Sequence, residues 1–125
     1  MKITGFNTQI ISKDPQAVVA LFEALGFNRT HNKTSDEDVV FSSIRMKDAN
    51  GYHVDVIEVE NVPANHDLTA IRINVDDFDA AYQLLIDHGF RESKSFGVHY
   101  TPTSKYAYLI SPSGFLIGLC LHIKK

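Results

Sequence analysis

The chain repeats one segment at a constant spacing of 63 residues, and this repeat limits its possible folds more than any other feature. Residues 14–27, DPQAVVALFEALGF, resemble residues 77–90, DFDAAYQLLIDHGF, without a gap. The same spacing aligns Gly51 with Gly114, outside that segment. Because one spacing relates two separate parts of the sequence, we expect two copies of a single supersecondary module.

Each half predicts the same order of elements, beginning with a strand and a helix. Isoleucine and valine alternate with polar residues in the strand expected at 69–75, and a matching strand is expected at 4–12. An aspartate precedes each apolar helical stripe and is expected to cap it, with Pro15 at the first helical position of the first half. Gly26 and Gly89 follow the stripes and predict the left-handed residue that ends a helix.

A polar loop and a strand pair complete each half. We expect the loops at residues 28–38 and 91–105, where polar residues predominate. Asn-Gly at 50–51 and Ser-Gly at 113–114 are typical of hairpin turns. The strands around these turns are expected at residues 39–46, 53–59, 106–110 and 115–123.

A polar segment separates the two halves. Residues 60–67 contain Pro63 and few apolar side chains, which predicts a link. The modules then span residues 1–62 and 63–125 and form one structural domain. Placed side by side, two such units give an α+β fold with one curved mixed sheet, helices on one face and a cleft on the other.

Composition excludes several classes of function. The chain has a formal net charge of -3, so it has no general attraction for nucleic acid phosphates or anionic lipid. It contains no apolar run long enough to span a membrane, and residues 1–6 lack the apolar core of a signal peptide. Cys120 is the single cysteine, which precludes an internal disulfide. We therefore expect a cytoplasmic protein.

One segment identifies a family. Residues 111–117, SPSGFLI, are similar to the Asp-Pro-Asp-Gly-Asn turn before the last strand of the vicinal oxygen chelate superfamily. This superfamily contains glyoxalases, bleomycin resistance proteins and extradiol dioxygenases. Residues 48–51 are a weaker copy of the turn, and an Asp-capped helix that ends in Gly-Phe is also typical. The resemblance covers nearly the whole chain and implies two tandem βαβββ modules, but it does not imply one reaction.

The resemblance also implies where a metal would bind. Family enzymes place ligands, usually His and Glu, seven residues before the capping Asp and four residues after the turn Gly. In this chain those positions hold Asn7, Asp55, Ala70 and Gly118. Only Asp55 is a good oxygen donor, whereas a catalytic metal takes about three protein ligands. We therefore expect no cofactor.

A displaced divalent metal site is the alternative. His53, Asp55 and His122 have the strand parity needed to share one sheet face. The simpler interpretation is that each histidine is a solvated imidazole near a strand end.

Strand alternation predicts which side chains line the cleft and bind a ligand. The expected ligand-binding residues are Asn7, Gln9, Asp55, Arg72, Asn74, Tyr106, Tyr108 and His122. Arg72 either binds a carboxylate or phosphate of the ligand or forms an internal ion pair with Asp55. Tyr106 and Tyr108 either form aromatic walls or only pack in their strand. The opposite face is apolar and is expected to pack against the helices.

Three hypotheses for function follow. The first is a metal-free protein that binds a small organic molecule, anionic ones included, as bleomycin-resistance-like members do. The resemblance also implies a homodimer. The second is a glyoxalase-like lyase or isomerase, or a dioxygenase, with a shifted metal site. The third is a structural or interaction protein with a vestigial cleft. The sequence leaves open whether the chain is an enzyme.

Overall fold

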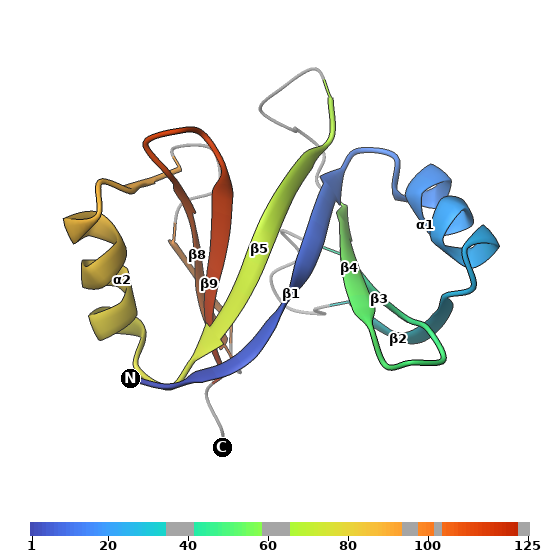
Figure 1. Ribbon diagram of the computed structural model, residues 1–125, viewed down its shortest axis with the longest axis horizontal. Helices are drawn as coiled ribbons and strands as arrows, with labels where there is room; N and C mark the ends of the chain where they lie inside the picture. Colours follow the sequence, from blue (N-terminus) through green and yellow to red (C-terminus); the bar gives the residue numbers. More distant parts are fainter. Residues whose placement is uncertain (35–41, 59–65, 94–97, 102–103, 123–125) are drawn as a thin grey trace. The chain divides into compact units, whose positions relative to one another are not determined.

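The computed structural model describes residues 1–34, 42–58, 66–93, 98–101 and 104–122 (Figure 1). It is an α+β fold with a mixed sheet and two helices, as the repeat predicts. The chain divides into two compact units. The N-terminal unit is Asn7–Thr69, and the C-terminal unit is Met1–Phe6 together with Ala70–Lys125. The predicted division into modules at residues 62 and 63 stays a prediction.

The N-terminal unit contains one helix and four strands in the order β2-β3-β4-β1. β1 runs parallel to β4, while β3 is antiparallel to both β2 and β4. Its elements are β1 (Ile3–Ser12, from Asn7 onward in this unit), α1 (Pro15–Ala24), β2 (Asn28–Thr34), β3 (Ser42–Lys47) and β4 (His53–Glu58).

The C-terminal unit has the same plan, with strands in the order β5-β9-β8-β6 and with β7 also paired to β8. The first residues of β1 belong to it, since the Asp76 N–H donates to the Lys2 carbonyl at 3.1 Å. Its elements are β5 (Leu68–Val75, from Ala70 onward in this unit), α2 (Phe78–Asp87), β6 (Arg91–Glu92), β7 (Val98–Thr101), β8 (Ser104–Ile110) and β9 (Leu116–His122).

The 63-residue repeat is confirmed in the backbone. Helices α1 and α2 begin and end at equivalent residues. The predicted helix-ending glycines, Gly26 and Gly89, have φ values of 103° and 90°, which favour glycine over residues with a Cβ. The turn glycines, Gly51 and Gly114, have φ values of 88° and 108°.

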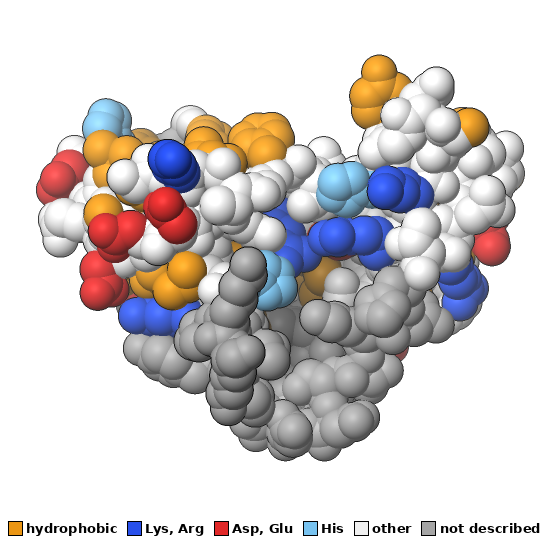
Figure 2. All heavy atoms as spheres, turned by 90° about the horizontal axis from the view of Figure 1, so that it is seen from below, with side chains coloured by type: hydrophobic (Ala, Val, Ile, Leu, Met, Phe, Trp, Pro, Cys, Tyr) orange, Lys and Arg blue, Asp and Glu red, His pale blue; other side chains and the backbone are white. Residues whose placement is uncertain are grey.

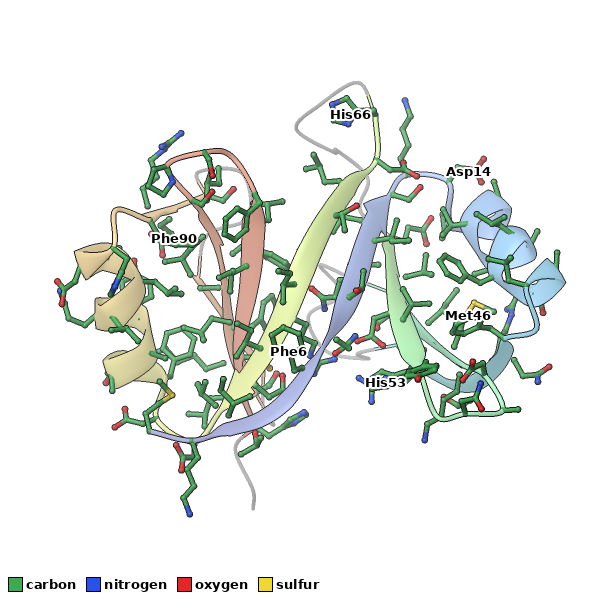
Figure 3. The ribbon with its side chains drawn as sticks, in the orientation of Figure 1. Phe6, Asp14, Met46, His53, His66 and Phe90 are labelled. Atoms are coloured by element: carbon green, nitrogen blue, oxygen red, sulfur yellow. The ribbon has the colours of Figure 1, made fainter. Side chains whose placement is uncertain are left out.

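Each unit buries an apolar core between its helix and its strands, and the predicted helix-facing side is confirmed. In the N-terminal unit, Val19 of α1 packs with Met46 and Val56 (Figure 3). In the C-terminal unit, Phe78 of α2 packs with Leu109 and Leu119. Burial of such a side chain contributes about 1.5–3 kcal/mol, so these contacts hold each helix on its sheet.

The predicted loops are partly wrong. Residues 28–34 form β2, and residues 91–92 and 98–101 form β6 and β7. β2 and β6 each pair along one side, with β3 and β8. Because such strands have little apolar face to bury, their sequences lack the alternation that identifies a half-buried strand. Residues 35–38, the start of the strand expected at 39–46, most of the link at 60–67 and residue 123 lie outside the described residues.

The predicted aspartate cap is confirmed for α2 but not for α1. Asp77 accepts a hydrogen bond from the Ala80 N–H at 3.1 Å, as a capping side chain should. Asp14 occupies the equivalent position, but it makes no capping hydrogen bond with the described residues. Its own N–H donates to Ser12 Oγ at 3.0 Å instead. Neither helix has the length and apolarity needed to cross a bilayer.

Candidate functional site

The N-terminal unit has a polar sheet face on the side opposite α1. Alternation along β1, β3 and β4 sends Ile10, Met46 and Val56 toward the helix. The residues between them point to the other side. We call this side the polar face and define it by Asn7, Gln9, Arg45, Lys47, His53 and Asp55. Figure 3 shows His53 at the start of β4, away from α1.

A buried carboxylate lies at the centre of the polar face. Asp55 is 1% exposed and lies between Gln9 of β1 and Arg45 of β3 in the strand register. Arg45 Nε donates to Asp55 Oδ1 at 2.8 Å, and Arg45 Nη2 donates to Oδ2 at 3.1 Å. Asn7 Nδ2 donates to the same Oδ2 at 3.0 Å. The result is a bidentate, charge-assisted pair supported by an amide.

The two side chains of this pair differ in their exposure to solvent. The Arg45 side chain is 39% exposed, while that of Asp55 is 1% exposed. The hydrogen bond to Asp55 raises the pKa of Arg45, burial opposes that shift, and the charge of Asp55 adds to it. The guanidinium therefore stays charged, with a buried carboxylate on one edge and access to solvent elsewhere.

The β3–β4 turn sets this geometry. Asp48 Oδ1 accepts hydrogen bonds from the Asn50 N–H at 3.0 Å and the Tyr52 N–H at 2.9 Å. Gly51 supplies the positive φ that the turn needs. The turn fixes the register that places Arg45 opposite Asp55. A slip of β3 by one residue against β4 would send Arg45 toward α1 while Asp55 stayed on the polar face, so the turn sequence determines the ion pair.

The C-terminal unit carries a different polar set on β5, β8 and β9. Arg72 Nε donates to Asn74 Oδ1 at 3.0 Å, and Arg72 Nη2 lies 4.0 Å from Cys120 Sγ. Arg72 and Tyr108 both pair with Gly118 in the register. Figure 1 shows β5, β9 and β8 in sequence across this unit. The ring centroids of Tyr106 and Tyr108 are 6.5 Å apart in an edge-to-face arrangement.

The predicted ligand-binding residues thus fall into two groups. Asn7, Gln9 and Asp55 come together on the polar face of the N-terminal unit. The other predicted residues, all in the C-terminal unit, are Arg72, Asn74, Tyr106, Tyr108 and His122. His122 is exposed at the end of β9. A cleft that joins the two groups, and an Arg72–Asp55 ion pair, stay predictions.

Arg45 is a residue of the polar face that the sequence did not predict. It occupies none of the family's ligand positions, so the resemblance did not select it. The turn signal alone would not have found it, because a two-residue turn at Asn50-Gly51 would pair Arg45 with Val56. The turn in the structure spans residues 48–52 instead, which pairs Lys47 with His53 and Arg45 with Asp55.

The residues at the family's metal positions do not fit a divalent cation. Both carboxylate oxygens of Asp55 already accept hydrogen bonds from Arg45. Asn7 turns its amide nitrogen, rather than its oxygen, toward Asp55, and donates to the Thr8 carbonyl as well. Ala70 and Gly118 have no donor atom in their side chains. Within the described part of the chain, no group of three His, Cys, Asp or Glu residues could hold a metal.

Comparison with known sequences gives one match. The sequence model of the Glyoxalase/Bleomycin resistance protein/Dioxygenase superfamily matches residues 6–119. The match includes both helices, both turns and the strand residues discussed above, except the first residues of β1, Cys120 and His122. No curated protein matches the sequence significantly.

Comparison with solved structures shows the same fold. Methylmalonyl-CoA epimerase from Mycobacterium tuberculosis is 15% identical with a TM-score of 0.66, covering 95% of this chain and 88% of that one. A glyoxalase/bleomycin resistance protein/dioxygenase superfamily member from Vibrio splendidus 12B01 is 17% identical with a TM-score of 0.60, covering 96% and 99%. A mutant of glyoxalase I from Zea mays is 15% identical with a TM-score of 0.68, covering 96% and 43%. Identities this low establish similarity of fold alone.

Proposed function

Since the chain belongs to the glyoxalase, bleomycin resistance protein and dioxygenase superfamily, we propose that it is a metal-free member that binds a small organic molecule. The Arg45–Asp55 pair carries this proposal. It places a protein cation on the one carboxylate that the family positions provide. A ligand would then be held by side chains rather than by a bound metal ion.

Buried polar side chains on the sheet support a binding role. Asn7 is 9% exposed and Gln9 is 5% exposed, although both lie on the side of the sheet that α1 does not cover. Burial of polar groups costs free energy unless they are hydrogen-bonded, so a fold without a polar site would favour apolar residues at these positions. Ligand sites typically combine an apolar surround with a few such polar groups.

The metal-dependent alternative, a glyoxalase-like lyase or isomerase or a dioxygenase, meets a specific obstacle. A shifted site built on His53, Asp55 and His122 would need oxygens of Asp55 that Arg45 now occupies. Freeing them would break a bidentate pair whose carboxylate is buried. The removal of one partner from such a buried pair costs about 3–5 kcal/mol, which metal binding would have to offset.

We also propose that the protein forms a homodimer and is located in the cytoplasm. The single cysteine, Cys120, is buried and forms no disulfide, which is in keeping with a reducing compartment.

Two measurements on the purified wild-type protein test the proposal. Metal analysis after purification without chelator should find no stoichiometric Zn, Ni, Fe or Mn. A thermal-shift survey of small organic acids, alcohols and aromatic compounds should find ligands that raise the melting temperature, because a ligand at about a hundred times its Kd stabilises by about 2.7 kcal/mol. Stoichiometric metal that is lost in Asp55→Asn, or a survey without a single stabilising compound, would contradict the proposal.

A further inference from the structure

Three basic side chains share the polar face of the N-terminal unit near the β3–β4 hairpin. Arg45 and Lys47 are two positions apart on β3, so they point to the same side of the sheet. Lys47 pairs with His53 across the hairpin. In Figure 2, Lys, Arg and His side chains gather on one part of the visible surface, to the right of its centre. Asp55 is the acidic residue that β1, β3 and β4 place on this face, and it is buried, so the exposed charge is positive.

Arg45 has donors that its ion pair does not use. A guanidinium carries N–H groups along two edges. The edge formed by Nε and Nη2 faces Asp55. The second edge, formed by Nη1 and the other hydrogen of Nη2, points away from that carboxylate. Since the side chain is 39% exposed, this edge can present a bidentate fork to a ligand.

The buried carboxylate also orients the guanidinium. Asp55 itself is held by a second donor, Asn7 Nδ2, at 3.0 Å. Two hydrogen bonds from Arg45 to a fixed carboxylate define the plane of the guanidinium before any ligand arrives. A group that is already oriented loses less conformational entropy on binding than a mobile surface side chain does.

We propose that Arg45, oriented by Asp55 and flanked by Lys47 and His53, is an oxyanion-binding site that anchors the carboxylate or phosphate group of a small organic ligand. This inference rests on the proposed function, because it places the charged end of that ligand on the polar face of the N-terminal unit. The guanidinium then serves as a permanent cation beside the carboxylate of Asp55. Lys47 adds positive charge two positions away along β3, and His53 lies opposite Lys47 on β4.

Arg29 provides a matched control in the same unit. Its side chain is also 39% exposed and also lies near a carboxylate, with Nε 4.0 Å from Glu23 Oε2 of α1. Here the carboxylate is 51% exposed, so the pair is solvated and contributes little to the stability of the fold. The two arginines therefore have the same exposure and differ in whether a buried carboxylate orients them.

The test follows the Arg45 Nε–H signal by heteronuclear NMR while the wild-type protein is titrated with three probes. The probes are benzoate, phenyl phosphate and benzamide, the last being a neutral analogue of benzoate. We expect both anions to shift the Arg45 signal and benzamide to leave it unchanged. The ratio of the two anion Kd values distinguishes a carboxylate site from a phosphate site.

Variants then separate bidentate recognition from general charge. Arg45→Lys keeps a positive charge beside Asp55 and so preserves the fold, but an ammonium has no second planar edge. We expect this variant to bind the preferred anion about tenfold more weakly, which corresponds to about 1.4 kcal/mol. Arg29→Lys should bind it with the wild-type Kd.

Three outcomes would overturn the inference. Equal weakening in both lysine variants would assign binding to the overall charge of the unit. Anion binding that shifts other signals but not that of Arg45 would place the site elsewhere, while leaving the proposed function intact. Binding of none of the probes would contradict the oxyanion site, whereas the proposed function fails only if the broader thermal-shift survey also finds no ligand.

Discussion

Position 55 of the N-terminal unit holds a buried aspartate, whereas the equivalent position 118 of the C-terminal unit holds glycine. The same contrast extends to the neighbouring strand, where Arg45 is equivalent to Tyr108. The helix-facing positions differ much less: Met46 is equivalent to Leu109, and each is 0% exposed. The repeat thus preserves the apolar contacts and turns that specify the module, while the side chains on the opposite face differ between the two units.

The largest effect expected from this comparison is on the Arg45–Asp55 ion pair of the N-terminal unit, whose equivalent positions in the C-terminal unit hold Tyr108 and Gly118. Arg45→Met would remove two charge-assisted hydrogen bonds from the Asp55 carboxylate, which is 1% exposed. We expect the free energy of unfolding to fall by about 3–5 kcal/mol in urea denaturation. Arg29→Met, which removes a solvated pair, should cost less than about 1 kcal/mol. Similar losses in both variants would mean that Asp55 is solvated after all.

Alanine substitutions in the apolar cores should destabilise the two units to a similar extent. Met46→Ala and Leu109→Ala each remove a fully buried side chain from equivalent sites beneath α1 and α2. We expect each to lower the unfolding free energy by about 2–5 kcal/mol, since both leave a cavity against a helix. A negligible loss for one of them, measured in the same urea experiment, would break the structural equivalence of the two modules.

Substitution of the aspartate that precedes each helix should affect stability differently in the two units. Asp77→Ala removes a hydrogen bond to the Ala80 N–H and should cost about 1 kcal/mol. Asp14→Ala removes no capping bond, so we expect a loss of only about a few tenths of a kcal/mol. Thermal unfolding of the two variants under identical conditions provides the measurement. Equal losses would show that Asp14 caps α1 in solution.

The smallest effect concerns a tyrosine that the N-terminal unit lacks, since Tyr82 is equivalent to Val19. Burial raises the pKa of Tyr82, and the charge of Glu92 and its hydrogen bond raise it further. The folded state therefore retains this proton at a pH where the unfolded state releases it. The resulting stabilisation is complete below about pH 10 and is lost as pH rises through the folded pKa.

Tyr82→Phe tests this dependence. The difference in unfolding free energy between the wild type and Tyr82→Phe should change with pH only above about pH 10, where the wild type should lose stability faster. The difference isolates Tyr82 from the other groups that titrate in alkaline solution. A difference that stays constant across the alkaline range would contradict the shifted pKa.

Most of the module could be predicted from the sequence because the local signals for helices, helix ends and turns agree with one another. The positions of Gly26 and Gly89 and the apolar stripes before them placed both helices correctly. The strand β2 could not be predicted, since its sequence, NRTHNKT, contains no apolar residue and therefore no apolar alternation. The absence of a cap bond at Asp14 also escaped prediction, because an N-cap residue type does not fix its rotamer.

The candidate site could be predicted only in part. The ligand positions of the family, counted from the capping Asp and the turn Gly, identified Asn7 and Asp55. The structure places these two side chains in hydrogen-bonding contact. Arg45 required knowledge of which strand lies beside β4 and in what register, which depends on the turn at residues 48–52. Composition and motif spacing contain no such information about tertiary contacts.

We propose that Arg45 binds the carboxylate of Asp55 in place of a divalent metal and also binds the anionic group of the ligand. The most direct measurement titrates the wild-type protein first with zinc and then with benzoate, while the Arg45 Nε–H signal is followed by NMR. We predict that zinc leaves this signal unchanged and that benzoate shifts it to saturation. A zinc-dependent shift that saturates stoichiometrically, and that Asp55→Asn abolishes, would contradict the claim.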